Sequence, residues 1–131
     1  MTATAMTARL DRLKKRAEFL RVAATRARAV RPGFILQAAP RPDAEGAPLR
    51  IGYTASRRVG NAVARNRAKR RLRAAAASVL PLHGRPGTDY VLIARAGTGG
   101  RVYAELLADL EGALRQLARP RAAHTGRGGE G

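Results

Sequence analysis

The sequence contains no cysteine, and aromatic residues make up only 4% of its 131 residues. Without cysteine the chain has no disulfide, no thiolate metal ligand and no catalytic thiol. So few aromatic rings also mean that base stacking on this protein is not widespread. No apolar run approaches the roughly 20 residues of a membrane-spanning helix, so we expect no membrane partner.

Acidic residues are scarce as well: nine stand against 26 basic residues, which gives a formal net charge of +17. A protein that hydrolyses phosphodiesters with metal ions needs clustered carboxylates. The closely spaced acids of the predicted helices, Glu105, Asp109 and Glu111, fit the charged surface of one helix. His83 lies in a predicted turn and His124 in the tail, which does not suit a general acid and base pair. We therefore predict no catalytic residue and no metal site in this chain.

The positive charge consists of 23 arginines and three lysines. Charge this extreme indicates a polyanionic partner, most often nucleic acid. The planar guanidinium group suits contacts with phosphates and base edges. Hydrophobic residues still make up 45% of the chain, enough for one modest core. We expect one folded domain at 10–119, a flexible N-terminus at 1–9 and a disordered Gly- and Arg-containing tail at 120–131.

The hydrophobic pattern predicts a single α+β domain. Its predicted elements are a helix at about 14–27, strands at 34–39 and 49–56, a helix at about 61–80, a strand at 89–95 and a helix at about 101–119. The first two strands, joined by a polar loop, suggest an antiparallel pair. Pro81 is expected to end the second helix. The continuous apolar strand at 89–95 is expected to be buried on both faces.

The stretch 57–73 carries eight basic residues and no acid, yet it has a helical pattern. Gly60 allows a tight turn before the helix, and Asn61 suits its N-cap. Like charges four residues apart weaken an isolated helix, and no acid occurs anywhere in 46–88, so we expect phosphates to supply the counter-charge. A solvated charged face and a disordered arginine-rich arm are the alternatives. An apolar stripe argues against the arm, and its members are Ala68, Leu72, Ala75, Ala76 and Val79.

The ordered motif 59-VGNAVARNRAKRRLR-73 resembles the signature of the protein subunit of bacterial ribonuclease P. The segments 13-LKKRAEFLRV-22 and 91-VLIAR-95 resemble the first helix and a later strand of that family. The last predicted helix lies where the family has one, so the likeness covers about residues 10–119. The length and order of the motif make it a specific signal.

This resemblance implies an αβββαβα sandwich with a central mixed sheet and a left-handed crossover between a strand and the basic helix. It also implies that a large RNA, and not the protein, removes the 5′ leader of precursor tRNA in the cytoplasm. The Mg²⁺ for that reaction is then held mainly by the RNA. The expected partners are the catalytic RNA and precursor tRNA, with no DNA and no small-molecule substrate.

The resemblance further assigns two RNA-binding surfaces to this chain. A cleft between the first helix and the sheet holds the single-stranded leader, although two family aromatics appear here as Ala23 and Gln37. For Phe34 and Tyr53, ordinary core packing is an equal alternative. The predicted contacts with the catalytic RNA are Arg57, Arg58, Asn61, Arg65, Asn66, Arg67, Lys69, Arg70 and Arg73, and the predicted leader cleft contains Phe19, Phe34, Gln37 and Tyr53.

A ribosome-associated or general structured-RNA-binding protein is the main alternative of another class. Its support is the charge alone, and it does not explain the ordered motif. A DNA-compacting protein is weaker still, because the sequence shows no dimerising helix-turn-helix or ribbon arm. Selective binding of one structured RNA, as opposed to binding that follows charge and salt alone, separates these classes.

Overall fold

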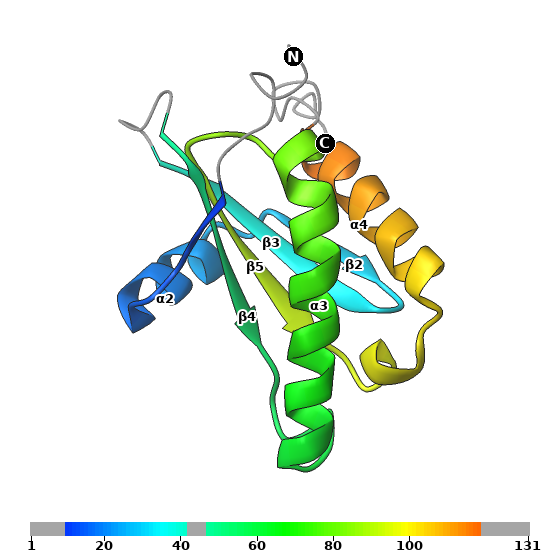
Figure 1. The fold of residues 1–131 in the computed structure, drawn as a ribbon. Coiled ribbons are helices and arrows are strands. Elements are labelled where there is room, and N and C mark those ends of the chain that lie inside the picture. The colour runs from blue at the N-terminus through cyan, green and yellow to red at the C-terminus, as the bar shows by residue number, and fades with distance from the viewer. Residues whose placement is uncertain (1–9, 42–46, 119–131) are drawn as a thin grey trace, which may run out of the picture.

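A five-stranded sheet with helices on both faces forms the body of the computed structural model, which describes residues 10–41 and 47–118 (Figure 1). The elements are β1 (Leu10–Arg12), α2 (Arg16–Ala24), β2 (Arg28–Arg31), β3 (Phe34–Pro40), β4 (Leu49–Thr54), α3 (Ala62–His83), β5 (Thr88–Ala94), the 3₁₀ turn η1 (Thr98–Gly100) and α4 (Tyr103–Ala118). The predictions of a flexible 1–9 and a disordered 120–131 lie outside the described residues.

The sheet is mixed, with strand order β1-β4-β5-β3-β2. β5 is parallel to β4 and antiparallel to β3, while β1 runs parallel to β4 and β2 antiparallel to β3. The predicted antiparallel pairing of the strands at 34–39 and 49–56 is therefore wrong. β5 lies between them because it is apolar on both faces and takes the central position, and its predicted burial on both faces is confirmed.

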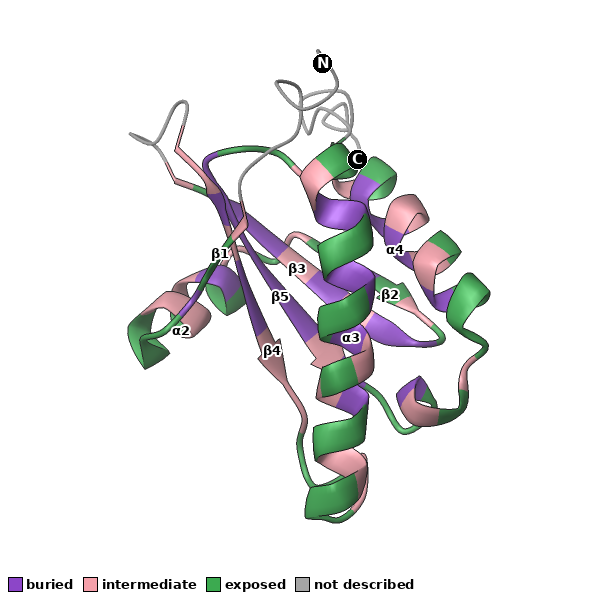
Figure 2. Ribbon diagram, in the orientation of Figure 1, coloured by how far each residue is buried: buried purple, intermediate pink, exposed green. Residues whose placement is uncertain are grey.

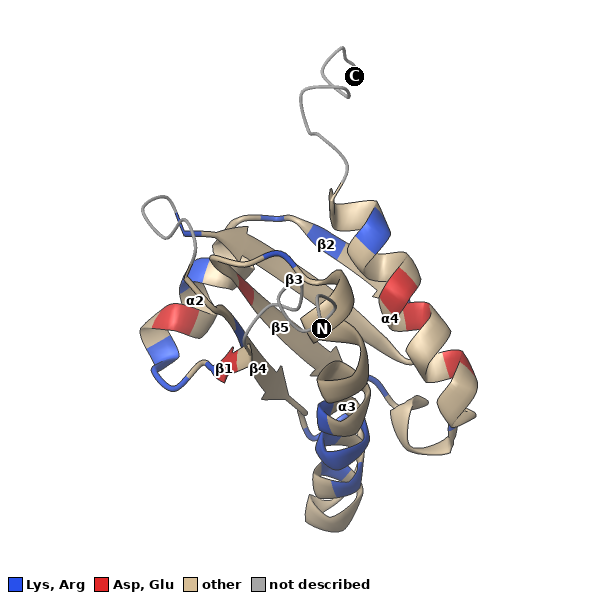
Figure 3. Ribbon diagram, turned by 45° about the horizontal axis from the view of Figure 1, so that its top comes forward, with Lys and Arg blue, Asp and Glu red and all other residues tan. Residues whose placement is uncertain are grey.

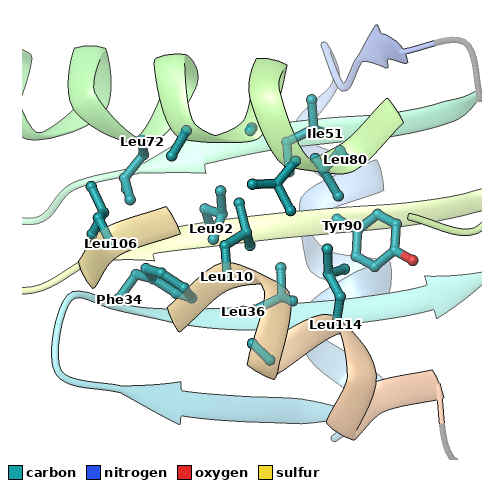
Figure 4. Close-up of a cluster of buried hydrophobic side chains, with 14 of the residues drawn as sticks. Phe34, Leu36, Ile51, Leu72, Leu80, Tyr90, Leu92, Leu106, Leu110 and Leu114 are labelled. Atoms are coloured by element: carbon teal, nitrogen blue, oxygen red, sulfur yellow. The ribbon is translucent and has the colours of Figure 1, made fainter. Parts of the chain in front are cut away.

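The two sheet faces are covered unequally. α3 and α4 lie on one face, and the main core forms between them and the sheet (Figures 1 and 4). α2 lies on the opposite face, where Leu13 and Val22 pack on Ala39 and Val91 (Figure 2). The strand period of two sends neighbouring residues to opposite faces. Fully buried members of the main core include Phe34, Leu36, Leu49, Ile51, Leu72, Leu80, Leu92, Leu106 and Leu110.

Two local predictions at the start of the domain need correction. The first helix is shorter than the predicted 14–27, because the chain turns at Arg26, whose φ of 65° is left-handed, and continues as β2. The hydrophobic pattern did not predict the strand β2, because the short segment 28-RAVR-31 has little apolar content, although the αβββαβα order implied by the family resemblance has three strands between these helices. Pairing with β3 along its length, and not its own propensity, makes it a strand.

The end of the second helix also differs from the prediction. α3 continues through Pro81 to His83. Proline removes one helical hydrogen bond, but the backbone N–H of Gly84 still closes the last turn on the carbonyl of Leu80, at 2.8 Å. The fully buried Leu80 anchors that turn in the core. In the last helix, α4 begins at Tyr103, two residues later than predicted.

Candidate nucleic-acid interface

The N-terminal half of α3 carries a dense cluster of basic residues and no acid. The predicted apolar stripe is confirmed, since its five residues are buried under the helix. The N-terminal half of α3 runs past the ends of the strands, and the Lys and Arg residues of the helix are concentrated in that half (Figures 1 and 3). We call the following residues the basic helix surface: Arg57, Arg58, Asn61, Arg65, Asn66, Arg67, Lys69, Arg70 and Arg73. All are exposed except Arg65 and Lys69, which are half-buried.

The turn before α3 is ordered by its own hydrogen bonds. The side-chain Oδ1 of Asn61 accepts from the backbone N–H of Ala64 at 2.9 Å, which confirms the predicted N-cap. Gly60 has a φ of 143°, a conformation that other residues rarely adopt. Its carbonyl accepts a 3.0 Å hydrogen bond from Nη1 of Arg65. Arg65 therefore stabilises the turn that fixes Arg57 and Arg58 beside the helix.

Tyr53 lies on the α3 face of the sheet, beneath this helix. The guanidinium carbon of Arg73 lies 5.5 Å from the centroid of the Tyr53 ring, which is a cation–π distance. Burial raises the pKa of Tyr53 to about 12, although the positive charges of Arg73 and Arg12 act to lower it. The structure therefore separates Tyr53 from α2 and brings it to the basic helix surface.

Acidic groups of the described residues are largely engaged elsewhere. On α4, Asp109 accepts from Nε of Arg101 at 2.8 Å, and Glu105 lies 3.4 Å from the same guanidinium (Figure 3). Arg71, which the prediction leaves out, donates to the backbone carbonyl of Arg101 and so joins α3 to the start of α4. None of the ion pairs within the described part of the chain involves the basic helix surface. Its charge is available to an external polyanion.

The face that carries α2 is only partly covered. The Phe19 ring lies directly on Gly52, where an added Cβ would stand 2.4 Å from Cε2 of the ring. Beyond α2, side chains that share this face by strand register remain half-buried or exposed. We call them the open sheet face: Val30, Ile35, Gln37, Thr54 and Ile93. Ala23, at one of the positions where the family has an aromatic, is exposed on α2.

The four residues predicted for one cleft are thus divided between the two sheet faces. Phe19 and Gln37 lie on the α2 face. Phe34 is fully buried in the main core, on the α4 side, and Tyr53 packs against that core. Phe34 therefore takes part in ordinary core packing, the alternative given for it above. Neither Phe34 nor Tyr53 belongs to the open sheet face. Strand alternation explains the division, because 34 and 37 differ by an odd number of residues.

A buried carboxylate that the sequence did not reveal holds α2 in place. Asp89 is fully buried and accepts hydrogen bonds from Nε and Nη2 of Arg50 at 2.8 and 2.7 Å, from Arg21 at 2.8 Å and from Arg41 at 2.5 Å. Burial acts to raise the pKa of Asp89, but the hydrogen bonds from these arginines outweigh it and lower the pKa to about 2. Arg50 also pairs with Glu18 of α2 at 2.8 Å. The signal available in the sequence was an acid opening an apolar strand after a long acid-free stretch.

The described residues form neither a metal-binding cluster nor a membrane-spanning helix. Within 10–41 and 47–118, no group of three or more His, Asp or Glu side chains is arranged to hold a metal ion. In the same ranges, no helix is both long and apolar enough to cross a bilayer.

An α+β domain that presents a guanidinium-rich helix beside a partly open sheet face is a nucleic-acid-binding domain. A family model, described as Ribonuclease P, matches residues 7–118 of this chain. The chain belongs to the ribonuclease P protein family and is a subunit of that tRNA-processing endoribonuclease. This membership implies association with ribonuclease P RNA and precursor tRNA, and it confirms the family resemblance of the motif in α3.

Curated relatives and solved structures agree with this assignment. The Ribonuclease P protein component of Paramagnetospirillum magneticum is 54% identical over 91% of this chain and 91% of its own length. The protein of the same name from Caulobacter vibrioides is 50% identical over 86% of this chain and 74% of its length. The structure of the Staphylococcus aureus RNase P protein matches with a TM-score of 0.64 at 25% identity, over 82% of this chain and 94% of that one. The Thermotoga maritima RNase P protein, at 21% identity, has the same fold with a TM-score of 0.62, over 85% of this chain and 98% of that one.

Proposed function

We propose that the basic helix surface binds the catalytic RNA of ribonuclease P, and that the α2 face binds the leader of precursor tRNA. As a subunit of ribonuclease P, the chain acts in 5′ processing of tRNA. The observation that carries the proposal is the ordered, exposed and acid-free half of α3. Its unpaired guanidinium groups release counterions from RNA when they bind phosphates.

Order in the turn supports a specific RNA partner. A charged arm without fixed structure binds polyanions according to salt and charge alone. Here Asn61, Gly60 and Arg65 fix the turn, so the exposed side chains of Arg57, Arg67 and Arg70 project from a rigid scaffold. A rigid set of guanidinium groups matches one arrangement of phosphates better than others, which favours a structured RNA.

The proposed leader-binding surface on the α2 face combines one aromatic ring with polar and apolar side chains of the sheet. Phe19 supplies the ring on the α2 side, and Gln37 lies on the sheet floor where the family has an aromatic. Because Ala23 and Gln37 cannot stack on bases, we infer that charge and backbone contribute more here. Contact with the leader favours precursor over product, since the product lacks it.

We assign the Mg²⁺ of the reaction mainly to the RNA subunit. The described acids are dispersed or bound by arginines, a donor set that does not suit a divalent cation. The protein then acts by position and charge, because positive surface between two RNAs reduces their repulsion and lowers the Mg²⁺ that they need. From family membership we also infer a left-handed β4-α3-β5 connection and a cytoplasmic site of action.

Reconstituted cleavage tests this function. Precursor tRNA is incubated at low Mg²⁺ with a bacterial ribonuclease P RNA alone, with this protein alone and with both. We expect 5′ cleavage only in the mixture. Cleavage by the protein alone would contradict the division of labour. A protein that binds RNA in proportion to charge, yet adds nothing to cleavage, would instead be a general RNA-binding protein.

A further inference from the structure

The free edge of the sheet carries an arginine that the functions above do not use. β2 is the terminal strand on the side away from β4 and β1. Its residue Arg28 is exposed and lies directly opposite Gln37 in the antiparallel register. Residues paired in this way have their side chains on the same sheet face, with Cβ atoms about 5 Å apart. Arg28 is therefore the neighbour of Gln37 on the open sheet face.

An apolar row leads across the open sheet face toward that edge. The register places Ile93, Ile35 and Val30 side by side on adjacent strands. Val30 is 55% exposed although it is apolar, because α2 does not extend over β2. The row gives a floor for unstacked bases, and Arg28 at the edge gives a cation for the backbone that carries them.

Charge around Arg28 favours a polyanion. None of the ion pairs formed by the described residues involves Arg28. Arg26 is exposed two residues before the start of β2. Arg95 lies at the other end of the strand pair, where its Nη1 donates to the carbonyl of Arg31 at 2.8 Å. The free edge is thus flanked by guanidinium groups at both ends.

We propose that Arg28 binds a backbone phosphate of the precursor leader at the point where the leader leaves the open sheet face over β2. This inference rests on the proposed function, in which the α2 face holds the leader. The basic helix surface lies at the C-terminal end of β4, whereas β2 is the opposite side of the sheet. From β4 to β2 the path crosses three strand spacings, about 14 Å. In the proposed arrangement the leader enters from the side of the basic helix surface, so Arg28 meets only leaders long enough to cross the sheet.

A charged edge strand also has a purely protective explanation, since charge on an edge prevents pairing with other sheets. The two explanations differ in what they predict for RNA. Edge protection predicts aggregation of an Arg28 variant and unchanged RNA affinity of the soluble protein. A phosphate contact predicts an affinity loss that depends on leader length and salt.

The test uses holoenzyme assembled from ribonuclease P RNA with wild-type protein, Arg28→Ala or Arg28→Lys. Affinity is measured for precursors whose leaders are shortened one nucleotide at a time. For long leaders we expect Arg28→Ala to lose on the order of fivefold in affinity, and the log–log salt slope to fall by about 0.7, as for one phosphate of a single strand. Arg28→Lys retains most of the affinity. With leaders too short to reach β2, all three proteins bind equally.

Arg85→Ala is the matched control, because Arg85 is an exposed arginine on the loop after α3, outside the open sheet face. It should leave the dependence on leader length unchanged. If wild-type holoenzyme discriminates between long and short leaders but Arg28→Ala matches its affinity at every length, the proposed contact between Arg28 and a leader phosphate is wrong. The proposed binding of the leader to the α2 face is then unaffected. If wild-type holoenzyme shows no dependence on leader length, the proposed leader surface fails and this inference fails with it. Aggregation of Arg28→Ala with unchanged affinity of its soluble holoenzyme also overturns the inference in favour of edge protection.

Discussion

At the scale of single residues, Asp89 is the acid on which the position of α2 most depends. Its fully buried carboxylate is shared by guanidinium groups from α2, from the residue after β3 and from β4. Removing one partner from such a buried network leaves the opposite charges unpaired, which costs more than the pair itself contributes. The arrangement also explains why so basic a chain retains a carboxylate in the middle of its sheet.

Asp89→Asn should lower the free energy of unfolding by about 3 kcal/mol, because three arginines then lose their anionic partner. Urea unfolding of the two proteins measures the difference. Glu105→Gln is a control, since its carboxylate is more than half exposed and pairs with Arg101 at 3.4 Å. It should change stability by less than about 1 kcal/mol. Equal effects of both substitutions would contradict the role of Asp89.

The same carboxylate predicts a dependence on pH. The pKa of Asp89 is about 2 in the folded protein, against an ordinary value of 3.8. Because the folded pKa is the lower one, its contribution is complete above about pH 4 and is lost as the pH falls toward 2. The contribution is about 2 kcal/mol. As the pH falls through that range, Asp89→Asn should therefore lose less stability than the wild type. Parallel plots of the free energy of unfolding against pH for the two proteins would contradict the lowered pKa of Asp89.

At the scale of elements, α2 and α3 differ in what positions them. α3 begins at a local cap and turn, and its apolar stripe follows the helical period. α2 has a single fully buried residue, Val22, and depends on contacts with distant strands, through Phe19 on Gly52 and Glu18 on Arg50. The position of the proposed leader surface is therefore set by tertiary contacts.

This difference explains what could be predicted from the sequence. The cap, the turn and the stripe of α3 follow from residues within a few positions of one another, and they were predicted correctly. The place of β5 between β3 and β4 and the pairing of Asp89 depend on residues far apart in the chain. Short-range patterns contain no information on those pairings. The prediction that Phe34 lines the leader cleft was wrong for a related reason. The alternation of residues along a strand does not show which face of the sheet α2 covers.

Gly52→Ala tests the position of α2. A Cβ at residue 52 would stand 2.4 Å from the Phe19 ring, so the ring and α2 must move away from the sheet. We expect a loss of about 1–3 kcal/mol in stability, together with weaker binding of precursor tRNA that carries a leader. Binding of leaderless tRNA should not change.

Gly112→Ala is the matched control for that substitution. Gly112 lies within α4, and an added Cβ there would be 3.6 Å from Nη2 of Arg31, an ordinary contact distance. Alanine in place of a helical glycine should leave stability unchanged or raise it by up to about 1 kcal/mol. If Gly52→Ala behaves like Gly112→Ala, Phe19 does not hold α2 on the sheet as described.

At the scale of the whole molecule, charge and core are arranged in separate regions. The core lies between the sheet and the two helices α3 and α4, and the basic half of α3 extends beyond it (Figures 1 and 3). Most acids of the described residues form ion pairs with arginines, and these acids lie on α4, on α2 and in β5. The self-repulsion of a +17 chain is therefore concentrated where RNA is proposed to bind, and binding relieves it.

The most direct test of this account is the affinity of ribonuclease P RNA for the double variant Arg67→Ala with Arg70→Ala. Both side chains are exposed, and neither takes part in the hydrogen bonds or ion pairs of the described residues, unlike Arg65, so the variant should fold normally. We predict an affinity loss of at least about tenfold at moderate salt and a smaller salt slope, with Arg85→Ala close to wild type. An unchanged affinity of the double variant, or an equal loss in Arg85→Ala, would contradict the claim that the basic helix surface is where the catalytic RNA binds.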